Sequence, residues 1–151
     1  MLKKRISYVD YDGNERTEDF YFNLDRRELS EMNYQVDGGL DKMLQRIIDS
    51  QDTRRIVEFF TDLIKKSYGK KSPDGRRFIK NEEVLEDFLQ TEAYTELYME
   101  LIGDADKASA FVRGIIPKQL LDAADANVTR LQNQYTKNER EIDATDVKVV
   151  K

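Results

Sequence analysis

The stretch from residue 68 to residue 106 constrains the fold most, because a turn-forming basic loop is followed there by an acidic segment with helical periodicity. Residues 65–80 carry seven cations against one anion, whereas residues 82–106 carry nine anions and no Lys or Arg. Ser72-Pro73-Asp74-Gly75 has type I turn chemistry, with Pro at its second and Gly at its fourth position. The apolar residues that follow recur at the spacing of one helical face: Val84, Leu85, Phe88 and Leu89. The stretch therefore predicts a loop followed by amphipathic helices.

Residues 4–24 predict a β-hairpin. The segments 5–9 and 20–24 alternate and are rich in β-branched and aromatic residues, and Asp12-Gly13 between them is a strong turn signal. The acidic residues around this turn do not fit an EF-hand. Placing Gly13 at the sixth position of such a loop puts Tyr8 at the first ligand position, where it cannot ligate calcium.

Helix start signals precede several apolar-periodic segments. Asp25 is expected to cap a short helix with Glu28 in a capping box, and Asp52, Asn81 and Asp104 are expected N-caps of later helices. Gly69 is expected to end the helix that Asp52 starts. The helical segments predicted on this basis are 26–32, 40–48, 53–68, 82–89, 91–103 and 104–116, with weaker spacing at 120–135.

A chain of 151 residues with 39% hydrophobic and 36% charged residues fits one soluble domain with a real core. We therefore expect an α+β fold that is mainly α. Its single globular domain spans 1–135, with the β-hairpin at 4–24 and a compact bundle of about five to six helices within 25–135. Residues 136–151 are polar, offer few apolar anchors, and are predicted to form a flexible C-terminal tail.

The residue inventory argues against enzymatic chemistry. Because the chain has no His and no Cys, it lacks Ser-His and Cys-His nucleophile pairs, histidine acid–base groups and the usual zinc ligands. The loop is not a phosphate-binding loop, since five residues rather than four separate Gly69 from Gly75. The neighbouring carboxylates of 82–87 are expected on a solvated helix face. We expect no enzyme, no metal site and no cofactor.

The expected setting is the cytoplasm, because no apolar run approaches membrane-spanning length and the N-terminus lacks the apolar core of a signal peptide. A net charge of −5 argues against nucleic acid as a partner. A regulatory or nucleic-acid-binding function, with the basic loop 65–80 as its contact, is the alternative to the protein-binding functions that follow.

Two surfaces are candidates for protein binding. The first is an aromatic and aliphatic stripe for a partner, formed by Tyr94, Leu97, Tyr98 and Leu101, with core packing as the alternative and residues 105–116 as the second choice. The second consists of two oppositely charged groups of residues, which favour head-to-tail self-association of two copies. They are Arg76, Arg77 and Lys80 of the loop and Glu83, Glu86 and Asp87 of the helix. Pairing of this loop and helix within one chain is the competing outcome.

The chain resembles the tail assembly chaperones of long-tailed, siphovirus-type bacteriophages of Gram-positive hosts. The resembling stretches are KRISYVDYDGNERTEDFYFNL (4–24), SYGKKSPDGRRFIKNEE (67–83) and FLQTEAYTELYMELIGDADKASAFVRGIIP (88–117). The resemblance implies a non-enzymatic protein of the host cytoplasm that is absent from the mature virion. It also implies binding to the long tape measure protein, which it keeps soluble, and recruitment of the major tail (tube) protein during tail assembly.

Overall fold

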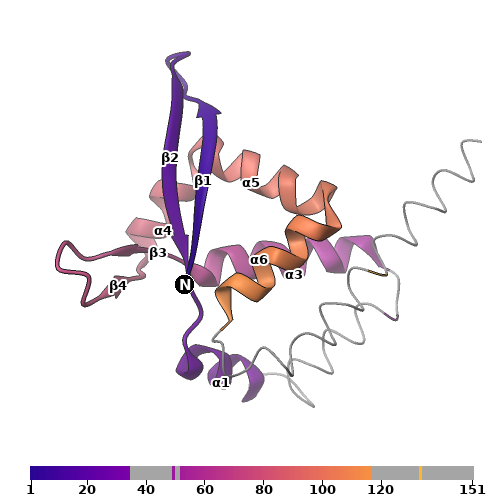
Figure 1. Ribbon diagram of the computed structural model, residues 1–151. Helices are drawn as coiled ribbons and strands as arrows, with labels where there is room; N and C mark the ends of the chain where they lie inside the picture. Colours follow the sequence, from indigo (N-terminus) through magenta and orange to yellow (C-terminus); the bar gives the residue numbers. More distant parts are fainter. Residues whose placement is uncertain (35–48, 50–51, 117–132, 134–151) are drawn as a thin grey trace, which may run out of the picture.

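The computed structural model describes residues 1–34, 49, 52–116 and 133 (Figure 1). The elements follow in the order β1 (Leu2–Val9), β2 (Glu15–Phe22), α1 (Arg26–Tyr34), α3 (Thr53–Ser67), β3 (Tyr68–Lys71), β4 (Phe78–Ile79), α4 (Glu82–Leu89), α5 (Glu92–Gly103) and α6 (Ala105–Ile115). The N-terminal hairpin and the helices that follow it confirm the predicted α+β, mainly helical fold. The predicted segments 40–48, 120–135 and 136–151 lie outside the described residues, except for Asn133.

The first hairpin forms where Asp12-Gly13 predicted it. The amide of Gly13 donates to the carbonyl of Asp10 over 3.0 Å, and the amide of Asp10 donates to the carbonyl of Asn14 over 2.9 Å. Gly13 has a φ of 84°, a left-handed conformation that Gly adopts without steric cost. The turn therefore aligns β1 and β2 in antiparallel register along their full length, from Leu2↔Phe22 to Val9↔Glu15.

The second hairpin, β3–β4, was not predicted as strands. The Ser72-Gly75 turn forms as expected, with the amide of Gly75 donating to the carbonyl of Ser72 over 2.8 Å. It joins two short strands that extend the sheet to the order β1-β2-β3-β4. The prediction that Gly69 caps the preceding helix is wrong: α3 ends at Ser67, and Tyr68 is already extended, so Gly69 lies within β3.

The predicted helix starts are confirmed for the most part. Asp25 and Glu28 form the reciprocal capping box, with the Glu28 amide donating to Asp25 Oδ1 over 2.8 Å and the Asp25 amide donating to Glu28 Oε1 over 3.2 Å. The side chains of Asp52, Asn81 and Asp104 each accept a hydrogen bond from the first turn of their helix. Short polar side chains at these positions satisfy amides that a helix leaves without an internal partner.

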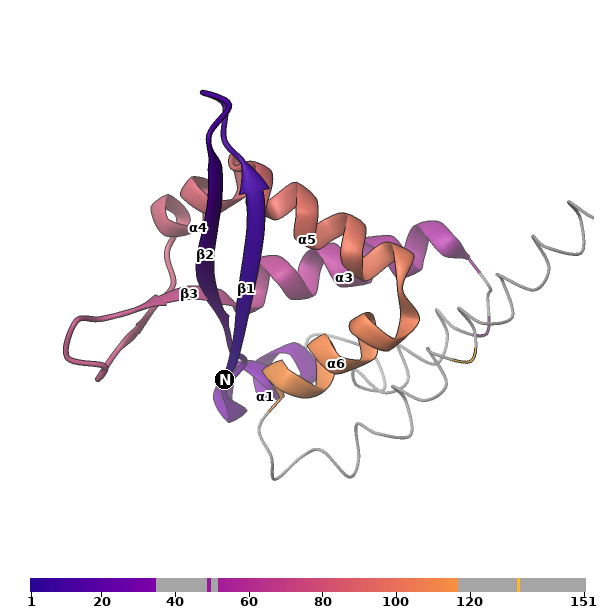
Figure 2. The same ribbon diagram turned by 45° about the horizontal axis from the view of Figure 1, so that its top comes forward.

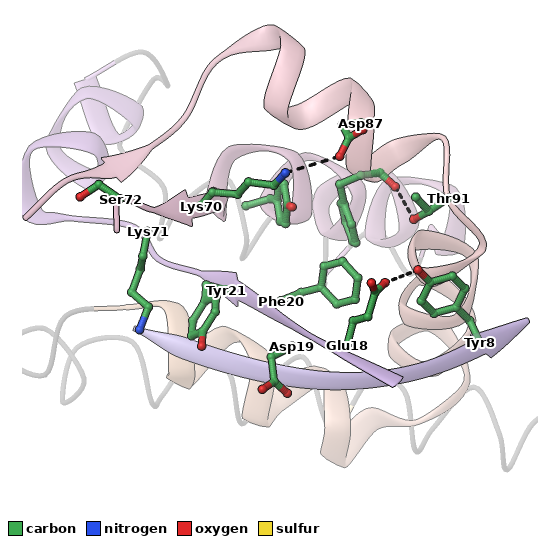
Figure 3. A pocket seen from close by; sticks show the side chains of 13 residues that line it. Tyr8, Glu18, Asp19, Phe20, Tyr21, Lys70, Lys71, Ser72, Asp87 and Thr91 are labelled. Carbon is green, nitrogen blue, oxygen red and sulfur yellow. Dashed lines mark hydrogen bonds and ion pairs between the residues drawn. The ribbon is translucent and has the colours of Figure 1, made fainter. Parts of the chain in front are cut away.

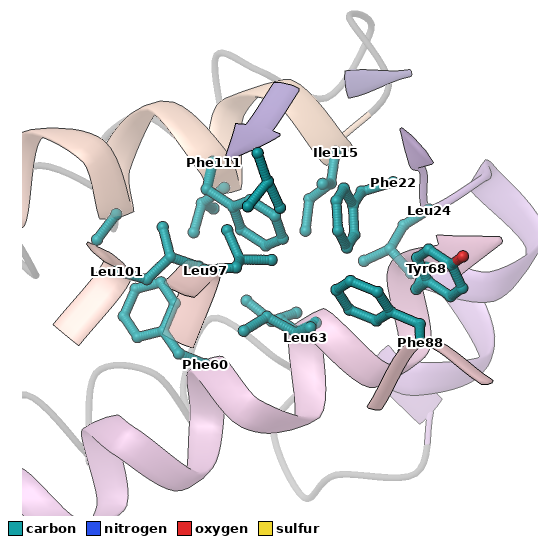
Figure 4. Close-up of a cluster of buried hydrophobic side chains, with 14 of the residues drawn as sticks. Phe22, Leu24, Phe60, Leu63, Tyr68, Phe88, Leu97, Leu101, Phe111 and Ile115 are labelled. Carbon is teal, nitrogen blue, oxygen red and sulfur yellow. The ribbon is translucent and has the colours of Figure 1, made fainter. Parts of the chain in front are cut away.

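Helices α3, α5 and α6 lie together on one side of the first hairpin (Figures 1 and 2). Rings from α6, β3 and α4 meet the hairpin around Phe22, whose ring centroid lies 5.3 Å from that of Phe111 of α6, 5.6 Å from that of Tyr68 of β3 and 5.9 Å from that of Phe88 of α4. Figure 4 shows the cluster with the leucines of α3 and α5 packed against these rings. The amide of Leu24 donates to the carbonyl of Ile115 over 2.8 Å, which fixes the end of α6 beside the strand that leaves the sheet.

Candidate interaction surfaces

The predicted partner-binding stripe divides between core and surface. Leu97 and Leu101 are 0% exposed and belong to the hydrophobic core, so they offer no contact surface in this structure. Tyr94 and Tyr98 are half-buried, with ring centroids 6.1 Å apart. The regular apolar spacing of α5 therefore marks the side that faces the core. For Leu97 and Leu101, this confirms the alternative that the stripe packs in the core. A partner-binding role stays a prediction for Tyr94 and Tyr98.

The second choice, α6, presents its main apolar side chains to the core as well. Phe111, Val112 and Ile115 are all buried. In both helices, a stripe at helical spacing indicates which face packs inward and does not by itself mark a docking site.

The outward side of α5 carries a small apolar surface, which we name the outer strip of α5. It consists of Met99, which is 61% exposed, and the half-buried Tyr98 and Ile102. Residues 98 and 102 are four positions apart, and residues 99 and 102 are three apart, so their side chains are neighbours on the helix. The carboxylate of Glu96 is exposed on the same helix.

The β3–β4 hairpin presents Arg76 and Arg77 on exposed positions and extends away from the helices (Figures 1 and 2). Ser72 holds its turn, because the Ser72 hydroxyl donates to Asp74 Oδ1 over 2.6 Å and accepts from the Arg77 amide over 2.9 Å. The Ser72 hydroxyl and the Arg76 amide hold the pKa of Asp74 below its usual value. The turn is therefore an ordered support for the two guanidinium groups.

Two of the residues predicted for self-association have partners within the chain. Lys80 Nζ lies 2.6 Å from Glu28 Oε2 and donates to the carbonyl of Asn23 over 2.6 Å. Asp87 Oδ2 lies 3.5 Å from Lys70 Nζ, which links α4 to β3. Pairing of the loop and the helix within one chain, the competing outcome, is thus found between Lys70 and Asp87, whereas Lys80 pairs with Glu28 of α1 instead.

The remaining four of these residues, Arg76, Arg77, Glu83 and Glu86, lie at exposed positions. Arg76 Nε is 3.8 Å from Asp74 Oδ2, and Glu86 accepts a 3.4 Å hydrogen bond from Gln90. These contacts are solvent-exposed and weak. Self-association through these four residues stays a prediction.

A groove of about 600 Å³ lies between β2, β3 and α4 (Figure 3). Sequence reasoning missed it, because it requires β3, which was not predicted. The residues that line it include Phe20, Tyr21, Tyr68, Lys70, Asp87 and Phe88. Burial first, and then the charges of Asp87 and Glu18, raise the pKa of Tyr68 to about 12. Burial and a hydrogen bond to Glu18 raise the pKa of Tyr8 to about 12, so folding favours the protonated form of both phenols.

The part of the chain that the structure describes contains no group of three or more acidic residues placed to hold a metal ion. Within that same part, no helix combines the length and the apolar character needed to cross a membrane.

A family model described as phage tail assembly chaperone matches residues 1–150 of the chain. No curated protein and no solved structure matches the chain significantly. The family match covers the hairpin, the helices and the groove described above. The chain therefore belongs to the phage tail assembly chaperone family.

Proposed function

We propose that the chain binds the tape measure protein of its phage, keeps that protein soluble, and helps to recruit tail tube subunits while the tail is built. Membership of the tail assembly chaperone family supports this general role and favours a non-enzymatic one. In this proposal the chain serves a long-tailed, siphovirus-type phage of a Gram-positive host. It acts in the host cytoplasm and is absent from the mature virion.

The observation that carries the proposal is the outer strip of α5. Met99 exposes 61% of its surface beside Tyr98, on a helix whose opposite face is fully buried through Leu97 and Leu101. Met and aromatic side chains are enriched in protein interfaces, and Met adapts to irregular apolar partners. The strip therefore offers contact area without requiring the core to open.

Charged groups border this apolar strip. Glu96 is exposed, while Glu100 holds Lys4 at 2.9 Å and Lys107 at 3.4 Å. Carboxylates around a small apolar surface limit nonspecific association and keep a complex soluble. This combination suits a protein that must hold an aggregation-prone client without precipitating with it.

Helix α5 is held to its neighbours along its length, which makes it a firm platform. The Lys4–Glu100 ion pair fixes its C-terminal half to β1. Ala93 and Leu97 are fully buried in the core, and the Tyr94 ring centroid lies 5.7 Å from that of Phe88 of α4. A client helix can pack along such a preorganised helix at little entropic cost.

Co-expression tests the proposal. The tape measure protein is produced alone, with the wild-type chain, and with Tyr98→Ala, Met99→Lys and Val9→Lys variants. Val9→Lys is the matched control, since Val9 is 53% exposed on β1 and the substitution makes a similar change away from α5. We expect the wild type and Val9→Lys to keep the tape measure protein soluble, and Met99→Lys and Tyr98→Ala to lose much of that effect while remaining folded.

Two outcomes contradict the proposal at different levels. Tape measure protein that is equally insoluble with and without the wild-type chain removes the function. Equal solubilisation by Met99→Lys and Val9→Lys removes the outer strip of α5 as the site.

A further inference from the structure

Strands β2 and β3 pair only at one end and then diverge. Their register consists of Tyr21↔Gly69 and Phe22↔Tyr68, whereas β2 begins six residues earlier, at Glu15. Along residues 15–20, no described strand pairs with the side of β2 that faces away from β1. Beyond Gly69, β3 pairs with β4 on its other side through Lys70↔Ile79 and Lys71↔Phe78. A wedge-shaped gap separates the two strands, and the groove described above occupies it.

The backbone groups of Thr17 and Asp19 point into this gap. In an antiparallel ladder, the N–H and C=O groups of alternate residues point to opposite sides of the strand. The carbonyl of Asn14, the residue before β2, accepts a hydrogen bond from the amide of Asp10 in the first hairpin. The backbone groups of the even-numbered residues of β2 therefore point toward β1. The amide of Asn23, the residue after β2, donates to the carbonyl of Ser67 over 2.8 Å. The backbone groups of the odd-numbered residues of β2 therefore point toward β3. Thr17 and Asp19 are odd-numbered and lie beyond the end of the β2–β3 pairing.

The far side of the gap has the same character. The amide of Ser72 donates to the carbonyl of Arg77 over 2.8 Å, so the even-numbered residues of β3 direct their groups toward β4. Lys71, one residue earlier, therefore directs its backbone groups toward the gap. Both strands that border the gap thus present backbone donors and acceptors to it.

The gap is hollow and partly apolar. Four consecutive residues of β2, 18–21, line the groove, so the edge of the strand and both of its faces border it. The Phe20 ring lies 5.1 Å from that of Phe88 and faces the groove from β2 (Figure 3). Tyr68 stacks on Phe88 with centroids 4.3 Å apart. A strand that enters here would have apolar rings to contact with alternate side chains.

The charged side chains at the gap are already paired within the chain. Glu18 accepts from Tyr8 and lies near Arg16, while Asp19 pairs with both Lys3 and Arg5. On the other side, Lys70 pairs with Asp87, and Lys71 Nζ lies 4.4 Å from the centroid of the Tyr21 ring. Because these charges already have partners, the gap does not favour the binding of a small ion. What it offers is a strand edge and aromatic surface.

We propose that this gap accepts an extended polypeptide segment of another protein, which adds a strand to the edge of β2. Hydrogen bonds to the backbone groups of Thr17 and Asp19 hold the segment, and its alternate apolar side chains pack on Phe20 and Phe88. This contact does not involve the outer strip of α5, and its test does not use the tape measure protein.

A pair of proline variants isolates the edge of β2. Thr17 lies opposite Ser7 of β1, both residues are exposed, and their hydroxyl oxygens are 2.9 Å apart. Thr17→Pro removes an N–H that faces the gap, whereas Ser7→Pro removes one that faces the outer edge of β1. Neither amide belongs to the β1–β2 ladder, and both variants lose the same hydroxyl contact. Ser7→Pro is therefore a matched control for the general cost of proline in a strand.

The probe is a fluorescent peptide of sequence KTVTFTVTK, with a copy N-methylated at alternate amides. Binding to the full chain is followed by fluorescence anisotropy. We expect wild type and Ser7→Pro to bind the peptide similarly, and Thr17→Pro to bind it at least about tenfold more weakly. The N-methylated copy, which lacks the strand-pairing donors, is expected to bind at least about tenfold more weakly to wild type. Amide hydrogen exchange at Thr17 and Asp19 is expected to slow when the unmodified peptide is added.

Three results would overturn the proposal. The first is no binding of the peptide to wild type at about 1 mM, the weak limit for a specific contact. The second is equal weakening in the two proline variants. The third is equal affinity for the peptide and its N-methylated copy, which would mean that side chains rather than the strand edge are recognised.

Discussion

Lys80 and Glu28 form an ion pair of 2.6 Å across 52 positions of sequence. Each side chain is only 22% exposed, and Lys80 also donates to the carbonyl of Asn23. Glu28 is at the same time the partner of Asp25 in the capping box, as the third residue of α1. The pair therefore joins three things: the end of the β3–β4 hairpin, the chain leaving β2, and the start of α1.

Lys80→Ala is expected to lower the free energy of unfolding by about 1–3 kcal/mol, because it leaves a shielded carboxylate and a backbone carbonyl without their donor. Arg76→Ala is the control, since its contact with Asp74 is 3.8 Å long and exposed, and it is expected to change stability by less than about 0.5 kcal/mol. Urea denaturation measures both. Equal effects of the two substitutions would show that the Lys80–Glu28 pair adds nothing.

Gly69→Ala is expected to destabilise the β3–β4 hairpin. A Cβ at this position would lie 2.7 Å from Phe78 Cε2 and 3.0 Å from the carbonyl oxygen of Ile79, which is backbone and cannot move aside cheaply. Overpacking of this kind costs about 1–3 kcal/mol. Gly103→Ala, where nothing lies within 4 Å of the added Cβ, is expected to be neutral or stabilising. A thermal unfolding temperature of Gly69→Ala at or above that of Gly103→Ala would contradict the close packing of Phe78 on Gly69.

Stability is expected to fall in alkali partly through Tyr68. The pKa of Tyr68 rises from 10.0 to about 12 in the folded chain, so folding favours the protonated phenol. Its contribution to the free energy of unfolding is complete below pH 10 and is lost as the pH rises to about 12. Tyr68→Phe keeps the ring that stacks on Phe88 and should flatten this decline, whereas Tyr11→Phe, at a position 77% exposed, should leave most of it. Identical pH profiles for Tyr68→Phe and wild type would contradict the assignment.

Salt-sensitive self-association is expected through the exposed guanidinium groups of the β3–β4 hairpin and the exposed carboxylates of α4. Residues 1–80 carry 17 cations and 15 anions, whereas residues 81–151 carry 8 and 15, so opposite surfaces of two copies can attract. Arg76→Glu combined with Arg77→Glu should reduce the sedimentation-detected oligomer at low salt. Lys65→Glu combined with Lys66→Glu makes the same charge change at exposed positions on α3 and should reduce it less. A strict monomer at low salt and high concentration would contradict this expectation.

Local chemistry made the first hairpin and the helix starts predictable. Asp12-Gly13 determines a turn by the conformational freedom of Gly, and Asp25, Asp52, Asn81 and Asp104 act on amides only two or three residues away. Such interactions depend only on residues close together in the sequence. The apolar spacing of α5 likewise identified Leu97 and Leu101 as one face of a helix.

The interaction surfaces were less predictable, because they depend on contacts between distant segments. The four-residue strand β3 forms because Tyr68 and Gly69 pair with Phe22 and Tyr21, and no local pattern distinguishes Gly69 from a helix-ending glycine. The same reason explains Lys80, whose partner lies 52 positions away. The spacing of a helical stripe also cannot show whether other elements cover it; in α5, strand β1 and helices α6 and α3 do so.

The most direct measurement is quantitative co-purification of the tape measure protein with tagged wild-type, Met99→Lys and Val9→Lys chains from cells that produce both proteins. The account predicts that the wild type and Val9→Lys retain comparable amounts of soluble tape measure protein, and that folded Met99→Lys retains several-fold less. Absence of the tape measure protein from the wild-type eluate, or equal retention by Met99→Lys and Val9→Lys, would contradict the claim that the outer strip of α5 binds it.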